Sequence, residues 1–85
     1  MAQRLRSLPR VIRPGGGRKI FIHLVPSDDP HFTPGGVAEG QEEYDTKKQI
    51  AHIWIDKNKT PRQQWLIYWH EMVHVMLEIY GDEKH

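Results

Sequence analysis

The stretch Thr60–Gly81, which reads TPRQQWLIYWHEMVHVMLEIYG, decides the fold of this chain. Thr60 is a favourable N-cap, Pro61 suits the first helical position, and Gln63 stands three residues after Thr60, where it completes a capping box. Gly81 is well placed to end the helix in a left-handed conformation. Because these start and stop signals agree, the sequence predicts one helix from Pro61 to about Tyr80.

Projection of this helix at about 100° per residue separates two apolar faces and one polar face. The wider apolar face, which suits packing on a sheet, holds Trp65, Leu66, Trp69, Val73, Met76, Leu77 and Tyr80. A second apolar strip lies opposite and holds Tyr68, Met72, Val75 and Ile79. The polar face holds Gln63, His70, Glu71, His74 and Glu78, beside Ile67. The second strip also needs a cover, which could come from the N-terminal arm, a second copy of the protein, or residues missing from this chain.

The segments before the helix have the composition of strands and turns. Residues 18–25 are rich in β-branched and aromatic types and predict a strand. A weaker strand over about 37–44, a turn over 45–48 and a better strand over 49–56 predict an antiparallel hairpin. Three prolines and two glycines predict a loop over 26–36. The expected fold class is therefore α+β, with a small antiparallel sheet of about three strands packed on one long C-terminal helix.

Composition and charge define the expected organisation. The 85 residues leave room for one small domain, and the absence of cysteine excludes disulfides and thiolate-bound zinc. Residues 1–19 carry six bases and no acid, whereas the other 66 carry six bases and eleven acids. We expect residues 1–17 to form a basic flexible arm, open to weak contact with nucleic acid, ahead of a domain over 18–85. With neither a signal peptide nor an apolar run long enough for a membrane span, a cytoplasmic location is expected.

The candidate chemistry lies in His70-Glu71-Met72-Val73-His74, on the second half of the predicted helix. Residues four apart share one helical face, so the imidazoles of His70 and His74 can both reach one cation. Glu71 is displaced by about 100° around the axis, where it borders that face without being a ligand and can accept a proton from water. This is the HExxH arrangement of zinc metalloproteases.

A third zinc ligand must be sought, because a catalytic zinc site usually has three protein ligands and one open position. After Gly81 the chain can turn back toward the site. His85 is the preferred candidate, since neutral imidazole is the commonest metal ligand. Glu83 and Glu78 follow as alternatives, although Glu78 is two turns, or about 12 Å along the axis, from His70.

Residues 49–85 resemble the active-site half of zincin metallopeptidases. The matching features are the strand Ile53–Asp56, the short loop to Thr60, and the helix with its HEMVH sequence. The chain is most similar to small bacterial and phage types, such as SprT-like, ImmA-like and minimal gluzincin domains. SprT-like proteins place a third histidine beyond the helix, which fits His85, whereas the other two types use a glutamate on a following helix.

The resemblance implies that His70 and His74 bind Zn²⁺, that Glu71 is the general base, and that an extended peptide lies along the strand ending at Asp56. Two functions follow as hypotheses. The first is zinc-dependent hydrolysis of a peptide or protein substrate, which the intact Glu71 favours. The second is a non-catalytic, metal-stabilised module that binds partners through its apolar helix strip and basic arm, which the small size favours.

Overall fold

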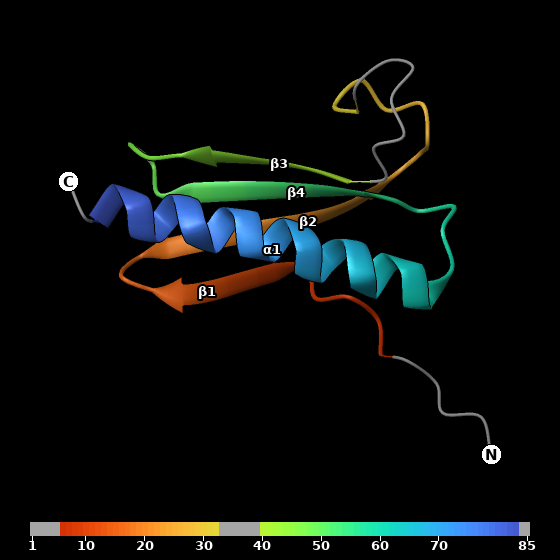
Figure 1. Cartoon of the computed structure of the whole chain (residues 1–85), viewed down its shortest axis with the longest axis horizontal. Coiled ribbons are helices and arrows are strands. Elements are labelled where there is room, and N and C mark those ends of the chain that lie inside the picture. The colour runs from red at the N-terminus through yellow and green to blue at the C-terminus, as the bar shows by residue number, and fades with distance from the viewer. Residues whose placement is uncertain (1–5, 33–39, 84–85) are drawn as a thin grey trace.

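The computed structural model describes residues 6–32 and 40–83, which form two layers, a sheet and a helix (Figure 1). Its elements, in chain order, are β1 (Val11–Gly15), β2 (Arg18–Val25), β3 (Gly40–Asp45), β4 (Ile50–Asp56) and α1 (Pro61–Glu83). The strand order in the sheet is β1-β2-β4-β3. The long C-terminal helix packs on one face of the sheet, against β3 and β4. The α+β class with one long C-terminal helix is therefore confirmed.

The sheet is mixed and four-stranded, which corrects the prediction of about three antiparallel strands. The hairpins β1–β2 and β3–β4 are antiparallel, but β2 and β4 pair in parallel, with Ile22 opposite Ile53. The two strands richest in isoleucine thereby lie at the centre of the sheet, where both faces can be covered. The more polar β1 and β3 form the edges.

Strand β1 corrects the prediction of a flexible arm over residues 1–17 where the chain runs from Val11 to Gly15, whereas residues 1–5 lie outside the described residues. Val11 pairs with Phe21 and Ile12 with Ile20, so this segment extends the sheet. The three glycines that were predicted to end a linker instead adopt φ values of 107°, 65° and 79° around the hairpin turn. Positive φ is accessible to glycine without steric cost, so the triplet favours a tight reversal as readily as a flexible stop.

The start of α1 is confirmed and its end is not. The Thr60 hydroxyl accepts the Gln63 N–H at 3.2 Å, and the Gln63 side-chain oxygen accepts the Thr60 N–H at 3.0 Å, which is the predicted capping box. The helix passes through Gly81, which has no positive φ, and continues to Glu83. A glycine inside a helix costs only about 1 kcal/mol relative to alanine, so it does not oblige the helix to end.

The helix packs on the sheet through the narrower of its two apolar strips, the reverse of the prediction. Tyr68, Val75 and Ile79 are at most 4% exposed, and Met72 packs against the same core. Their partners across the layer are side chains of the two central strands: Ile20, Ile22, Ala51, Ile53 and Ile55. From the wider face, Trp65 and Met76 are partly buried at the margin of the core. The rest stay 56–67% exposed: Leu66, Trp69, Val73, Leu77 and Tyr80.

The N-terminal segment over residues 6–10 is attached to the body. The Trp65 indole donates a hydrogen bond of 2.6 Å to the carbonyl of Arg6, and the Ile22 N–H donates one of 2.9 Å to the carbonyl of Arg10. Leu8 packs against the core. Hydrogen bonds to β2 and α1 thus hold the backbone of this basic segment. Its contact with nucleic acid stays a prediction.

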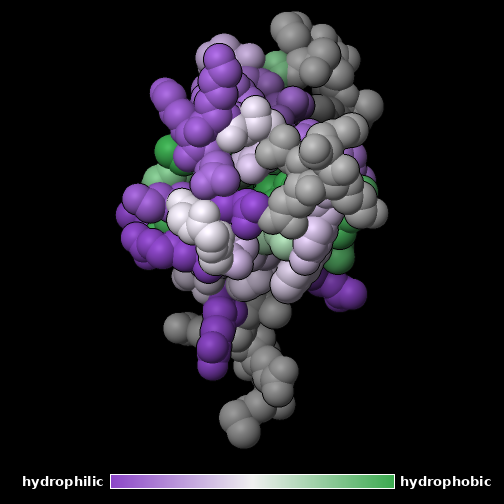
Figure 2. All heavy atoms as spheres, turned by 90° about the vertical axis from the view of Figure 1, so that its left-hand side faces the viewer, coloured by the Kyte–Doolittle hydropathy of each residue, from purple (hydrophilic) through white to green (hydrophobic). Residues whose placement is uncertain are grey.

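The end of the molecule where the two hairpins turn is mostly hydrophilic (Figure 2). At the β3–β4 turn, the Asp45 carboxylate accepts the backbone N–H groups of Lys47 and Lys48. Over the described residues, no helix is both long and apolar enough to cross a membrane.

Gly40 lies where α1 approaches β3 closely, and it gives a first prediction. A Cβ at this position would overlap with Cγ2 of Ile67 and stand 3.3 Å from Cγ of Glu71. Since the β-branched isoleucine cannot easily turn its methyl away, we expect Gly40→Ala to lower the free energy of unfolding by about 1–3 kcal/mol. Urea unfolding measures the effect.

Gly81→Ala is the matched control for that substitution. Gly81 is helical with open space around the position of its Cβ, so alanine there should raise the stability by roughly 0.5–1 kcal/mol. Equal effects of the two substitutions would contradict the close packing of α1 on β3.

Candidate metal centre

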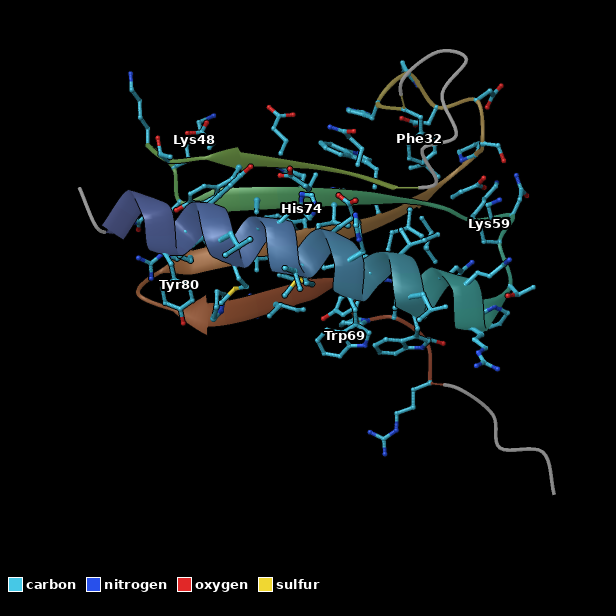
Figure 3. All side chains as sticks on the ribbon, viewed as in Figure 1. Phe32, Lys48, Lys59, Trp69, His74 and Tyr80 are labelled. Carbon is cyan, nitrogen blue, oxygen red and sulfur yellow. The ribbon has the colours of Figure 1, made fainter. Side chains whose placement is uncertain are left out.

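His70 and His74 lie one turn apart on the side of α1 that faces β3. Their ring centroids are 4.7 Å apart, and the two rings are tilted by 43°. The His70 side chain is 69% exposed, and His74 is exposed as well. Figure 3 shows His74 on the β3 side of the helix, whereas Trp69 and Tyr80 lie on the opposite side. The two imidazoles are therefore neighbours at the surface, as one shared cation requires.

Glu71 occupies the space between the histidine pair and β3. Its exposed fraction is only 8%, and its Oε1 lies 3.9 Å from Nε2 of His70. That separation is too long for a hydrogen bond, so the imidazole and the carboxylate are adjacent without being joined. The close approach of Gly40 holds this part of the helix against the strand. The arrangement places a carboxylate beside the histidines and under β3.

Glu42 of β3 joins this group, and the sequence analysis missed it. Burial raises the pKa of the Glu42 carboxyl, and the negative charges of Glu78 and Glu71 raise it further, whereas His74 lowers it. Within the described residues, Oε2 of Glu42 is buried and has no hydrogen-bond partner. A carboxyl in this position favours a proton or a cation close by.

The turn could have revealed Glu42 from the sequence. A hairpin reversing over residues 46–49 pairs Asp45 with Ile50, and the same register places Glu42 opposite Ile53. Because directly opposed residues share a face of the sheet, Glu42 must lie on the side that Ile53 buries under the helix. The hairpin was predicted from the sequence, but its register was not extended as far as Glu42.

The described residues do not supply a third ligand. Among residues 6–32 and 40–83, no three histidine, aspartate or glutamate side chains come together in a group that could hold a metal ion. Glu78 lies beside Glu42 on the β3 side. Glu83 is the last residue of α1, so the chain has not turned back at that point. The preferred candidate, His85, lies outside the described residues.

The position of β4 corrects the expected substrate-binding edge. The strand ending at Asp56 lies between β2 and β3 and is covered on both sides, so no extended peptide can pair with it. Asp56 itself is buried, and its carboxylate accepts hydrogen bonds from the Ser27 hydroxyl and the Asn58 N–H. These bonds hold its pKa below the ordinary value, chiefly the bond from the Asn58 N–H. In this sheet, β3 is the edge strand next to the histidine pair.

The other described histidines lie away from this centre, as expected for sheet and loop residues. Nε2 of His23 and Nδ1 of His52 share a hydrogen bond of 3.0 Å, and these two rings form a cluster with Trp54, with ring centroids 5.2–5.6 Å apart. The ring of His31 stacks on Trp54 with the centroids 3.9 Å apart. Burial lowers the pKa of His23, and so do the nearby His52 and His31. These rings lie on the face of the sheet opposite α1, because Ile22 and Ile53 alternate with them.

Comparison with protein-family models, curated proteins and solved structures finds no match. The resemblance to zincins therefore stays a prediction that rests on sequence features, the HEMVH sequence and its place on a capped helix.

Proposed function

We propose that this chain is a zinc-dependent peptide hydrolase in which His70 and His74 bind the metal ion and Glu71 is the general base. The observation that supports it most is the juxtaposition of two exposed imidazoles, 4.7 Å apart, with a carboxylate that is only 8% exposed. The third ligand stays unassigned among the described residues: Glu83 ends α1 nine residues, or about 13 Å along the axis, beyond His74, and His85 as the third ligand stays a prediction from the resemblance to SprT-like proteins.

The donor set fits zinc, which prefers imidazole nitrogens and carboxylate oxygens. Zinc lowers the pKa of water toward 7 and polarises a scissile carbonyl. Glu71 accepts a proton from water at its carboxylate and later donates it to the leaving amine. Among the described residues no strand pairs with the outer edge of β3, and this edge can hold an extended peptide by strand addition, beside the same carboxylate. The substrate class is thus an unstructured segment of a peptide or protein.

Zinc binding is the direct test of this proposal. We expect the wild-type protein to bind about one zinc ion per chain, and His70→Ala or His74→Ala to weaken the affinity at least 100-fold, because two neighbouring imidazoles supply most of the donor set. Competition with a chromogenic chelator measures the affinity. Saturating zinc should also stabilise the wild type by about 2.7 kcal/mol at 100 times the dissociation constant.

His31→Ala is the control, since His31 is an exposed loop residue on the other side of the sheet. This variant should keep the wild-type affinity for zinc. The proposal is wrong if the wild-type protein binds no divalent metal, or if His31→Ala loses as much affinity as His70→Ala.

A non-catalytic, metal-stabilised binding module is the second candidate. The observation that favours it is the apolar outer face of α1, where five large side chains are more than half exposed. Such a module predicts zinc binding and zinc-dependent stability without any turnover, so the two candidates differ in hydrolysis and not in metal content.

A further inference from the structure

A groove runs along the edge of β2 at the point where β1 begins. Within the described residues, the pairing of β1 with β2 reaches Phe21, and the Ile22 N–H then bonds to the carbonyl of Arg10. Ahead of Arg10 the chain runs to α1, where the Trp65 indole holds the carbonyl of Arg6 (Figure 1). The space between this segment, the end of β2 and the start of α1 is a groove of about 770 Å³, a volume typical of ligand sites.

The backbone of Leu24 points into this groove. Successive residues of a strand direct their N–H and C=O groups to opposite neighbours. The Val25 carbonyl accepts the N–H of Lys57, just past β4, so the odd-numbered residues of β2 bond on the β4 side. Ile22 bonds on the β1 side, and Leu24 faces the same way, where no described strand pairs with it. An extended peptide can pair with such an edge by strand addition.

The surroundings of the groove are basic. Arg6 and Arg10 line it, and none of the aspartates or glutamates in the described part of the chain does so. Its remaining wall is the start of α1, where the helix dipole contributes positive potential and the first turn holds no acid. Charge complementarity therefore favours an anionic occupant.

The rest of the lining favours a peptide over a nucleic acid. It is largely apolar and includes Leu8, Phe21, Ile22, Leu24, Val25 and Trp65. Leu24 is 48% exposed although it is a leucine at the end of a strand. A nucleic acid has neither a peptide backbone to pair with β2 nor apolar side chains to contact these walls, whereas a peptide has both.

We propose that this groove binds an extended acidic peptide, which adds as a strand to the outer edge of β2 at Leu24. The acidic side chains of the peptide lie in the positive potential of Arg6 and Arg10, and its apolar side chains contact the walls. The groove lies at the other end of the strand order from β3. The proposal therefore rests neither on zinc binding nor on peptide hydrolysis.

Fluorescence anisotropy with the full chain in a chelating buffer tests the binding. The probe is a labelled peptide in which valine and glutamate alternate, and the comparison peptide has lysine in place of each glutamate. We expect a micromolar dissociation constant for the acidic peptide and at least tenfold weaker binding of the basic one.

A charge exchange tests the role of the two arginines. The double variant with Arg6→Glu and Arg10→Glu should bind the acidic peptide at least tenfold more weakly than the wild type. The matched control is the double variant with Arg13→Glu and Lys47→Glu, which changes the net charge equally at exposed positions outside the groove. It should bind more than tenfold more tightly than the first variant. Circular dichroism checks that both variants are folded.

Amide hydrogen exchange locates the bound peptide. The Leu24 N–H should exchange rapidly in the free protein and at least tenfold more slowly in the complex, whereas the His23 N–H, on the β4 side, should not change. A Leu24 N–H that is already protected in the free protein would mean that the chain itself fills the groove. Protection of β3 amides instead would place the peptide at the edge proposed for substrate.

Either of these exchange results would overturn the proposal. So would a wild-type chain that does not bind the acidic peptide at 500 μM, equal binding of the two peptides, or tighter binding of single-stranded DNA of similar length. Equal loss of affinity in the two double variants would mean that only the overall charge of the chain matters, and would overturn it as well.

Discussion

Glu71→Gln is expected to lower the rate of peptide hydrolysis by about 100- to 10,000-fold, the usual contribution of a general base. Glutamine keeps the shape of the side chain but cannot take a proton from water. The fold should persist, because the substitution removes one of the negative charges that crowd Glu42. Release of fluorescence from a labelled unstructured protein measures the rate, and chelator competition on the same samples measures bound zinc.

Glu43→Gln is the control for this experiment. Glu43 is an exposed glutamate on β3, one residue along from Glu42 and on the other face of the sheet. It should keep the wild-type rate. If Glu71→Gln retains both zinc and full turnover, Glu71 is not the base. If the wild type binds zinc and hydrolyses nothing, the binding module is the better description.

Val75→Asp is expected to unfold the protein, whereas Val73→Asp should leave it folded. The two valines are two residues apart in the same helix, but Val75 is 0% exposed and Val73 is 57% exposed. An unpaired charge buried in the core costs about 3–5 kcal/mol, a large part of the stability of so small a domain. At Val73 the aspartate stays in water, and because valine and aspartate have similar helix propensities the change costs at most a few tenths of a kcal/mol.

Circular dichroism during thermal unfolding separates these outcomes. Each variant is the control for the other. Both replace a valine of α1 by aspartate, and only the direction in which the side chain points differs. If Val73→Asp unfolded and Val75→Asp stayed folded, the wider apolar face of α1 would be the one that packs on the sheet.

The features of this fold that were predictable from sequence depend on neighbouring residues. The capping box of Thr60 and Gln63 predicted where α1 begins, since its hydrogen bonds join residues three apart. The β-branched run 18–25 predicted β2 with the bounds that the structure has. The HEMVH spacing predicted that His70 and His74 share a face, because helical geometry alone places residues four apart together.

The missed features depend on residues far apart in the chain. A glycine triplet suits a linker and a hairpin equally, so only the pairing of Val11 and Ile12 with β2 distinguishes them. Alternation along β2 and β4 is the same whether they pair in parallel or not. Only the register between β2 and β4, in which Lys19 lies opposite Ile50 and Val25 opposite Asp56, shows that the two strands are parallel.

By itself, the sequence determined the long C-terminal helix, its start, and the presence of neighbouring imidazoles on one face, because local geometry decides each of these. The tertiary structure alone decided which apolar strip faces the core and which strand forms the edge beside the histidines. Both strips of α1 are apolar enough to be buried, so apolarity could not choose between them. The choice is visible only in the contacts across the layer, where Tyr68, Val75 and Ile79 pack on the isoleucines of β2 and β4.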